Sequence, residues 1–306
     1  MHHFQNRLRW IGILVALSGL HNTAGWAQSR IECSTLNSKI LKAPVRYCVF
    51  LPPHYEASTL VKETSPPAGR HYPVLYYLHG LGDNEQSLVN TGGWNLIQDL
   101  REQHKIGDFI IVTPEGGRTF YINSRDGKTR YSDFFIREFM PAIEHHYRIL
   151  HSSRGLMGIS MGGYGALRFA FSSPKLFTSV SAQSAALMTQ TPKDLNFAMK
   201  SGMGLTALLG DVFGNPIDLA FWGRNSPFVL ARKNHALFAK LKIYFDCGTE
   251  DEYGFDRGAS ALHNQLVGEN VKHEFHLYPG GHNLVYFLQH LGESVEFHSH
   301  AFDATR

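Results

Sequence analysis

One serine stands in a sequence setting that can make it a nucleophile. Residues 158–162 read Gly-Ile-Ser-Met-Gly, which follow an apolar run ending at Ile159 and open an apolar-faced helical stretch at 161–171. A serine at such a strand-to-helix turn exposes its hydroxyl, and only glycine fits two residues to either side of it. An ordinary glycine-rich turn is the alternative interpretation, but the flanking strand and helix favour Ser160 as the nucleophile of an acyl-transfer reaction.

A serine hydroxyl needs a base that accepts its proton, and the chain has 18 histidines. In a fold with this turn, the chain order is Ser, acid, His, and the acid and histidine follow later strands. His282 follows the expected strand 271–277 and the Pro-Gly-Gly turn 279–281, and it precedes a helical stretch at 284–291. His282 is therefore the predicted base.

The base needs a carboxylate that orients it, and this carboxylate should follow the expected strand 242–247. Asp246 lies inside that strand, whereas Glu250, Asp251 and Glu252 share the loop beyond it. At least two of these three loop carboxylates must be bystanders. We favour Asp251, in part because of the resemblance described below, and leave Glu252 open as the alternative.

An acyl-transfer site also needs two backbone N–H donors for the oxyanion. One is expected from Met161, the residue after the nucleophile. The other is expected from Leu81, in the loop after the first apolar strand, where Gly80 and Gly82 allow the backbone to turn. A plain glycine turn is the alternative for this loop.

Substrate contacts are harder to predict from residue types. Tyr121 and Asn123 follow the expected strand 109–112, so they should lie near the catalytic edge of the sheet. Trp222 lies in a segment that could line a pocket for an acyl or aromatic group. We predict that all three contact substrate, with packing inside loops as the alternative.

Short apolar runs alternate with helical patterns along the chain. Runs that are apolar on both faces indicate a parallel sheet covered by helices; they lie at 73–78, 109–112, 155–159, 178–182, 242–247 and 271–277. Helical patterns lie between them at 93–104, 131–146, 161–171 and 257–269. The chain lacks a G-x-G-x-x-G motif after the first strand, which excludes a dinucleotide-binding fold. We predict a mostly parallel, twisted α/β-hydrolase sheet with helices on both faces.

Two stretches interrupt this alternation. Residues 52–72 are rich in proline and read as a loop, and residues 185–238 carry glycine and proline interruptions but no clear strand. We interpret 185–238 as a small helical insertion. Residues 28–306 are then expected to form one domain.

The N-terminal segment 1–27 reads as a cleaved signal peptide. It has two arginines, no acid, an apolar run of eleven residues and small residues before a cleavage site expected after Ala27. Eleven residues are too few to span a bilayer, so a retained anchor is the less favoured alternative. The mature protein is expected to be secreted or periplasmic, without stable membrane association.

Export changes how the three cysteines are interpreted. Cys33 and Cys48 flank a turn-forming stretch, and a bridge between them would staple an N-terminal hairpin in an oxidising compartment. Cys247 is left over and is expected to be a buried free thiol.

Composition excludes several other classes of protein. The 306 residues are 43% hydrophobic and 18% charged, which suits a folded domain. A formal net charge of +3 is too small to indicate a surface that binds nucleic acid. No C-x-x-C pair suggests a zinc site, and no metal or cofactor is implied.

Four segments resemble the putative-esterase family of α/β hydrolases, which includes feruloyl and acetylxylan esterases, tributyrin esterases, S-formylglutathione hydrolases and mycolyltransferases. They are YLHGLGDNE at 77–85, GISMGGYGALRFAF at 158–171, CGTED at 247–251 and PGGHN at 279–283. The resemblance extends over about residues 30–297. It implies Ser160 as nucleophile, His282 as base, Asp251 as acid, and Leu81 and Met161 as oxyanion donors.

The resemblance leaves two points to be noted. In the mycolyltransferases the acid is a glutamate one place later, which keeps Glu252 as an alternative. The chain lacks the cysteine-bearing oxyanion segment of the S-formylglutathione hydrolases, which argues with export against a glutathione thioester as substrate.

These observations predict a secreted serine esterase. The expected substrates are short-chain, aromatic or carbohydrate-linked acyl esters, either as small molecules or attached to a polysaccharide. Acyl transfer to a sugar or alcohol is the first alternative. A non-catalytic binding module is a weaker one, because the complete set of nucleophile, base, acid and oxyanion turn is present.

Overall fold

The computed structural model describes residues 29–53, 55, 69–189 and 205–304; the predicted signal peptide lies outside these residues. The described strands form one eight-stranded sheet. They are β1 (Arg30–Ser38), β2 (Ala43–Leu51), β3 (Tyr72–Leu78), β4 (Ile110–Pro114), β5 (Ile149–Ile159), β6 (Ser179–Gln183), β7 (Lys242–Gly248) and β8 (Glu274–Tyr278).

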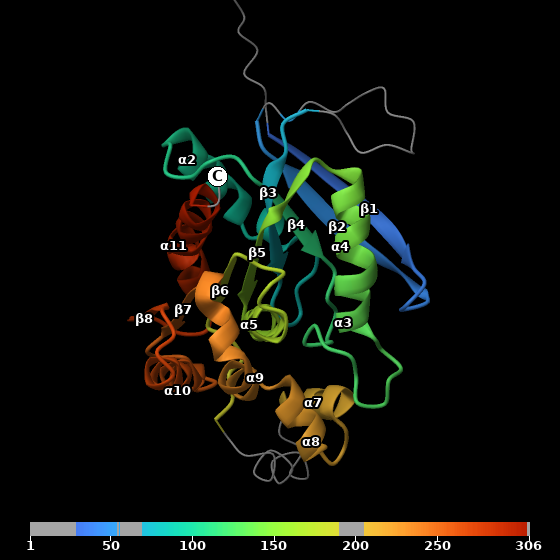
Figure 1. Ribbon diagram of the computed structural model, residues 1–306, viewed down its shortest axis with the longest axis vertical. Coiled ribbons are helices and arrows are strands. Elements are labelled where there is room, and N and C mark those ends of the chain that lie inside the picture. The colour runs from blue at the N-terminus through green and yellow to red at the C-terminus, as the bar shows by residue number, and fades with distance from the viewer. Residues whose placement is uncertain (1–28, 54, 56–68, 190–204, 305–306) are drawn as a thin grey trace, which may run out of the picture.

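The sheet has the order β1-β2-β4-β3-β5-β6-β7-β8 (Figure 1). β1 pairs with β2 and β2 with β4 in antiparallel fashion, and every other neighbouring pair is parallel. All seven residues of β3 are buried, as expected for a strand covered on both faces. The predicted mostly parallel α/β sheet is therefore confirmed.

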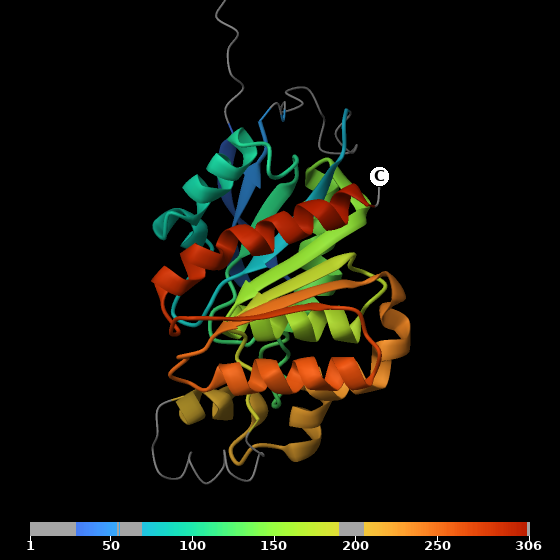
Figure 2. The same cartoon turned by 90° about the vertical axis from the view of Figure 1, so that its left-hand side faces the viewer.

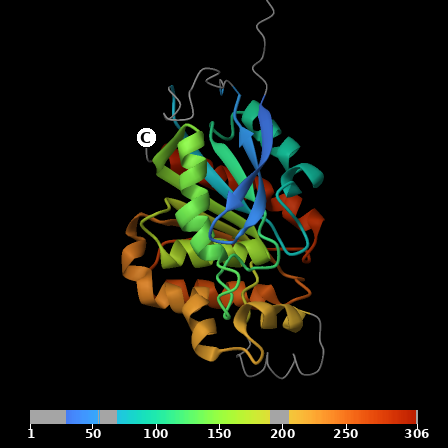
Figure 3. The same ribbon diagram turned by 90° about the vertical axis from the view of Figure 1, so that its right-hand side faces the viewer.

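Helices cover both faces of the sheet. The face in front in Figure 2 carries α1 (Ser87–Asn90), α2 (Gly93–Glu102) and α11 (Leu284–Asp303). The face in front in Figure 3 carries α3 (Tyr131–Phe134), the π-helix η1 (Phe135–Phe139) and α4 (Met140–His146). The apolar core on this second face also takes in α5 (Met161–Ser172) and α10 (Phe255–Gly268). None of the described helices has the length and apolarity needed to cross a membrane.

The described parts of the expected insertion 185–238 hold short helices joined by turns and irregular segments. It contains α7 (Leu205–Phe213), α8 (Leu219–Asn225), α9 (Pro227–Asn234) and the start of the 3₁₀ helix η2 (His235–Lys240). No strand occurs in its described parts, 185–189 and 205–238. α7 and α8 lie together at one end of the molecule (Figure 1).

Two strands begin more than one residue away from their predicted starts. β5 begins at Ile149, because residues before the apolar run also pair with β3 although several of them are polar. β8 begins at Glu274, three residues later than expected. The reason is that the Val271 amide donates to the Leu266 carbonyl, in the turn that follows the end of α10, and does not pair with β7.

The N-terminal hairpin and its disulfide are confirmed. Cys33 and Cys48 lie opposite one another on β1 and β2 and are bridged. Cys247 is a buried free cysteine on β7, and burial raises the pKa of its thiol well above the ordinary value. A buried thiol with a raised pKa is a poor nucleophile.

Removal of the disulfide should lower stability and leave catalysis nearly unchanged. A bridge that closes a loop of 15 residues contributes about 3 kcal/mol in the chain-entropy model. We expect the Cys33→Ser/Cys48→Ser double variant to melt about 5–10 °C below the native protein, with a kcat within about twofold. Thiol titration of the denatured, unreduced protein should find one free thiol per chain. Three free thiols would contradict the bridge.

Candidate active site

Ser160 lies at a strained turn between β5 and α5. Its backbone has φ 56° and ψ −116°, a conformation that costs energy for a residue with a side chain. A Cβ on Gly158 would overlap the Gly162 carbonyl, and a Cβ on Gly162 would overlap the carbonyls of Leu78 and His79. The two glycines of the motif are therefore required by close backbone packing, as the sequence predicted.

The turn brings Ser160 into contact with His282, which in turn contacts Asp251. The Ser160 Oγ lies 2.9 Å from His282 Nε2, and His282 Nδ1 lies 2.8 Å from Asp251 Oδ2. The carboxylate fixes the imidazole with its proton on Nδ1, which leaves Nε2 free to accept the serine proton. This is the arrangement that activates a serine hydroxyl in serine hydrolases.

Asp251 is held as a charged acceptor. The amides of Tyr253 and Phe255 donate to its Oδ1, at 3.0 and 3.4 Å, and the Cys247 thiol donates to its Oδ2, at 3.6 Å. Burial by itself would raise the pKa of Asp251. The hydrogen bond and charge of His282, together with the two amides, outweigh burial and lower the pKa below its ordinary value.

The geometry separates Asp251 from its rival Glu252. Glu252 is exposed, and its Oε2 accepts a hydrogen bond of 2.8 Å from the backbone N–H of His282, not from the ring. Asp251 therefore orients the imidazole, while Glu252 holds the loop that carries it. The sequence analysis favoured Asp251 and left Glu252 as the alternative.

The predicted oxyanion donors lie next to Ser160. Met161 is the first residue of α5, where N–H groups have no carbonyl one turn earlier to bond. A Cβ on Gly80 would lie 3.7 Å from the Ser160 Cβ, so the loop that carries Leu81 abuts the nucleophile. The Leu81 side chain is 40% exposed, and Gly82 has φ +86°, a left-handed conformation that favours glycine.

Tyr121 packs against the segment before Leu81 and does not line the cavity at Ser160. The predicted contact of Tyr121 with substrate is therefore wrong. The Tyr121 side chain is fully buried, and its hydroxyl donates to the His79 carbonyl at 2.9 Å. Buried His79 in turn accepts the Gly116 amide at Nε2 and lies 2.8 Å from the Gly80 carbonyl at Nδ1. These bonds fix the orientation of the His79 ring and the path of the backbone at Gly80. Sequence reasoning did not identify His79 as a supporting residue.

Asn123 and Trp222 also have partners away from the nucleophile. The Asn123 Oδ1 accepts the Asp133 amide at the start of α3. The Trp222 ring packs on Phe213, with centroids 4.5 Å apart. Neither residue lines the cavity at Ser160, so the structure does not support the predicted contacts.

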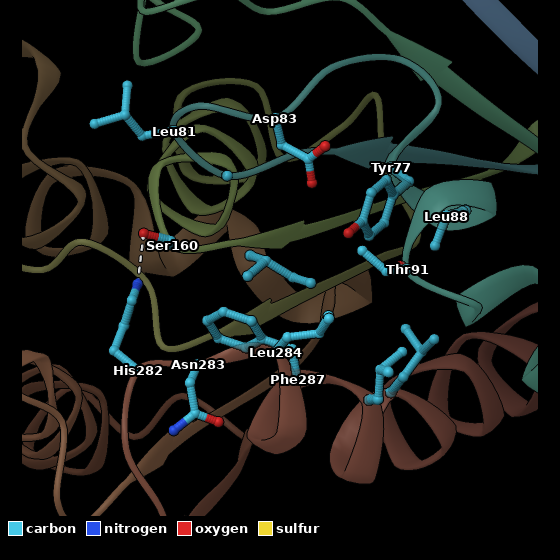
Figure 4. Close-up of a pocket in the computed structure, with 14 residues that line it drawn as sticks. Tyr77, Leu81, Asp83, Leu88, Thr91, Ser160, His282, Asn283, Leu284 and Phe287 are labelled. Carbon is cyan, nitrogen blue, oxygen red and sulfur yellow. Dashed lines mark hydrogen bonds between the residues drawn. The ribbon is translucent and has the colours of Figure 1, made fainter.

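A cavity of about 420 Å³ opens beside Ser160 and His282 (Figure 4). One wall comes from the first turns of α11, and the opposite wall from the end of β3, its following loop and α1. The lining combines apolar side chains with a few polar ones. The apolar side chains include Leu88, Ile159, Leu284, Phe287, Leu288 and Leu291. The polar side chains include Tyr77, Asp83, Thr91 and Asn283. Among the described residues, no group of three or more His, Cys, Asp or Glu is placed to hold a metal ion.

The chain resembles known esterases in sequence. It is 29% identical over 253 residues to an esterase of Mycobacterium tuberculosis; the match covers 76% of this chain but 51% of that relative, so the chain spans about half the relative's length. It is 26% identical over 296 residues to the diacylglycerol acyltransferase/mycolyltransferase Ag85B of Mycobacterium leprae, with 92% of this chain and 86% of that protein covered.

Solved structures and a family model agree with this resemblance. A ferulic acid esterase superposes with a TM-score of 0.73 at 26% identity, over 90% of this chain and 99% of that one. Residues 38–298 match the family model described as "Putative esterase". The chain therefore belongs to the putative-esterase family and has its α/β-hydrolase fold.

Proposed function

We propose that this protein is an exported serine hydrolase of carboxylic esters, with Ser160 as nucleophile, His282 as base and Asp251 as orienting acid. The observation that carries the proposal is the unbroken hydrogen-bonded path from Asp251 through His282 to Ser160, which ends beside an open cavity. The likeness to esterases supports the reaction class.

The geometry indicates how the reaction would proceed. The Ser160 Oγ attacks the ester carbonyl while His282 Nε2 takes its proton. The amides of Leu81 and Met161 stabilise the tetrahedral oxyanion. Collapse of this intermediate breaks the bond to the alcohol, which leaves with the proton from His282. Water, deprotonated by His282, then releases the acid from Ser160.

Export is part of the proposal. The signal-like segment 1–27 supports it, and so does the disulfide, because such bridges persist in oxidising compartments. Residue 28 would then be the first residue of the mature enzyme. Fractionation of cells that express the full chain, with sequencing of the mature N-terminus, tests both points.

The cavity suggests which esters fit. Its volume lies toward the small end of the range for ligand sites, and its apolar wall on α11 suits a short acyl chain or a ring. Asp83 gives the opposite wall a hydrogen-bond acceptor, and burial raises the pKa of this carboxyl. We therefore propose short-chain and aromatic acyl esters as substrates.

A panel of p-nitrophenyl esters of rising acyl length tests this substrate range. We expect acetate and butyrate to give the highest kcat/KM, and dodecanoate to fall at least about tenfold below butyrate, because a long chain outgrows the cavity. Methyl ferulate should also be hydrolysed. A preference for acyl groups beyond about ten carbons, with activation at lipid interfaces, would contradict the proposal.

Acyl transfer remains a second candidate, favoured by the identity to a mycolyltransferase over 92% of the chain. The two reactions share the acyl-enzyme and differ in whether water or an alcohol attacks it. Product analysis with butyryl ester and a sugar acceptor distinguishes them. Hydrolysis predicts free acid as the main product, and transfer predicts an acylated sugar.

A further inference from the structure

A buried polar cluster lies under the active site, between β6, β7 and α11. Gln183 and Asp246 are paired in register on the neighbouring strands β6 and β7, and both are almost fully buried. Residues paired in register point to the same face of a sheet. The Gln183 Oε1 and the Asp246 Oδ2 are both buried oxygens without a hydrogen-bond partner among the described residues. A buried acceptor that is left without a hydrogen bond costs free energy of folding.

The cluster contacts the segments that carry the serine and the histidine. The backbone carbonyl of Gln183 accepts the Ser160 amide at 2.9 Å, and its side-chain Nε2 donates to the Phe287 carbonyl at 3.3 Å. The Oδ1 of Asp246 accepts the Tyr286 hydroxyl at 2.7 Å. Gln183 and Asp246 therefore tie the first turn of α11, which begins two residues after His282, to the sheet below Ser160.

Tyr286 extends this connection to the histidine loop, which is the segment 279–283 that carries His282. A Cβ on Gly280 would lie 2.8 Å from the Tyr286 ring, so the ring packs directly against the turn that precedes His282. A shift of Tyr286 would move that turn, and with it the imidazole. Small displacements of a catalytic base have large effects on rate.

The surroundings of Asp246 favour its neutral form. Burial is the main cause that raises its pKa, to about 7, and the charge of Glu293 adds to it, while the hydroxyls of Tyr286 and Tyr244 lower it. No cation is among the groups that shift it. The titratable groups that face the cluster come from β7, β8 and α11; they are Tyr244, Cys247, His276, which is paired in register with Asp246, Tyr278, Tyr286, His290 and Glu293.

We propose that Asp246 is a positioning residue that works in its protonated form: its Oδ2–H donates to the Gln183 Oε1 while its Oδ1 accepts the Tyr286 hydroxyl. This single proton satisfies both unpaired oxygens and locks the histidine loop over Ser160. Loss of the proton places a negative charge beside the Gln183 carbonyl oxygen, which repels it and loosens α11. Only the predicted effect on kcat rests on the proposed ester hydrolysis; the predicted effect on stability does not.

Asp246→Asn tests the proposal, because an asparagine amide mimics the protonated acid. Its Nδ2 can donate to Gln183 and its Oδ1 can accept from Tyr286 at every pH. We expect the native kcat to fall at least about threefold between pH 7 and pH 9, as Asp246 loses its proton. The Asp246→Asn variant should keep at least half of the maximal kcat and lack the alkaline fall. Asp246→Ala should lose most activity at every pH.

Thermal melting against pH tests the same idea without any substrate, so failure of the proposed function would not obscure it. A carboxyl whose pKa is raised on folding costs stability as pH rises from its unfolded pKa, near 4, to its folded pKa, near 7. The Asp246→Asn variant should therefore melt several degrees above the native protein at pH 8 and equal it near pH 4.5. Asp99→Asn, the same change at an exposed helical site, should show no such difference.

Two results would overturn the proposal. If Asp246 acts as a carboxylate held by the hydroxyls of Tyr244 and Tyr286, then Asp246→Asn would melt below the native protein at neutral pH. If the alkaline fall of kcat belongs to another group, it would persist unchanged in Asp246→Asn.

Discussion

Replacement of Ser160 by alanine should lower kcat for ester hydrolysis about 10⁶-fold, to the level of the uncatalysed background plus the residual effect of the oxyanion site. The hydroxyl is the attacking atom, and no other described group takes its place beside His282 Nε2. The fold should be retained, because Ser160 is only half-buried and its loss leaves no buried partner unpaired. The measurement is kcat with p-nitrophenyl acetate, together with the thermal melting temperature.

Ser152→Ala provides the matched control, since it removes the same hydroxyl from an exposed position on β5. It should change kcat by less than about twofold. If Ser160→Ala kept more than a few per cent of native activity while Ser152→Ala behaved like the native protein, Ser160 could not be the nucleophile.

Replacement of Asp251 by asparagine should lower kcat about 10⁴-fold with little change in KM. The carboxylate holds the His282 proton on Nδ1; an asparagine can present its N–H there instead, which favours the tautomer with the proton on Nε2. A histidine protonated on Nε2 cannot accept the serine proton. The loss should therefore appear in kcat.

Glu252→Gln is the companion experiment, because sequence left these two carboxylates unresolved. The Glu252 side chain accepts a hydrogen bond from the His282 backbone, and a glutamine oxygen can accept the same bond. We expect this variant to lose less than about tenfold in kcat. A larger loss for Glu252→Gln than for Asp251→Asn would show that the acid has been misassigned.

The elements and most of the site could be predicted because their signals are local. Gly158 and Gly162 mark the strand-to-helix turn at Ser160 for a steric reason that the structure reproduces. The apolar runs mark strands that are buried on both faces. The choice between Asp251 and Glu252 was not local. It depends on how the loop after Gly248 turns, and that turn packs against Gly280 of a distant segment.

Tyr121 shows the limit of placing residues by sheet edge alone. It does follow β4 near the catalytic edge, but its backbone has φ 57°, and its ring is directed under the oxyanion loop, against Gly116 and Gly165. Position in the sequence gives the edge on which a residue lies, and not the direction of its side chain.

The length of α11 was also underestimated, at 284–291 instead of Leu284–Asp303. Its buried face includes polar residues that interrupt the apolar period, above all His298. Ser179 and Ser181 hydrogen-bond the two ring nitrogens of His298, at 2.7 and 2.8 Å, and burial lowers its pKa to about 3. A buried histidine satisfied by partners more than 100 residues away gives no helical signal in the sequence.

The most direct test of the central claim is covalent labelling of the folded protein with a fluorophosphonate, followed by intact-mass and peptide mass spectrometry. Such reagents react with serines activated by a neighbouring base. The account predicts one adduct per chain, located on Ser160, absent in Ser160→Ala and strongly slowed in His282→Ala. An adduct on any other residue, or equal labelling of the Ser160→Ala variant, would contradict it.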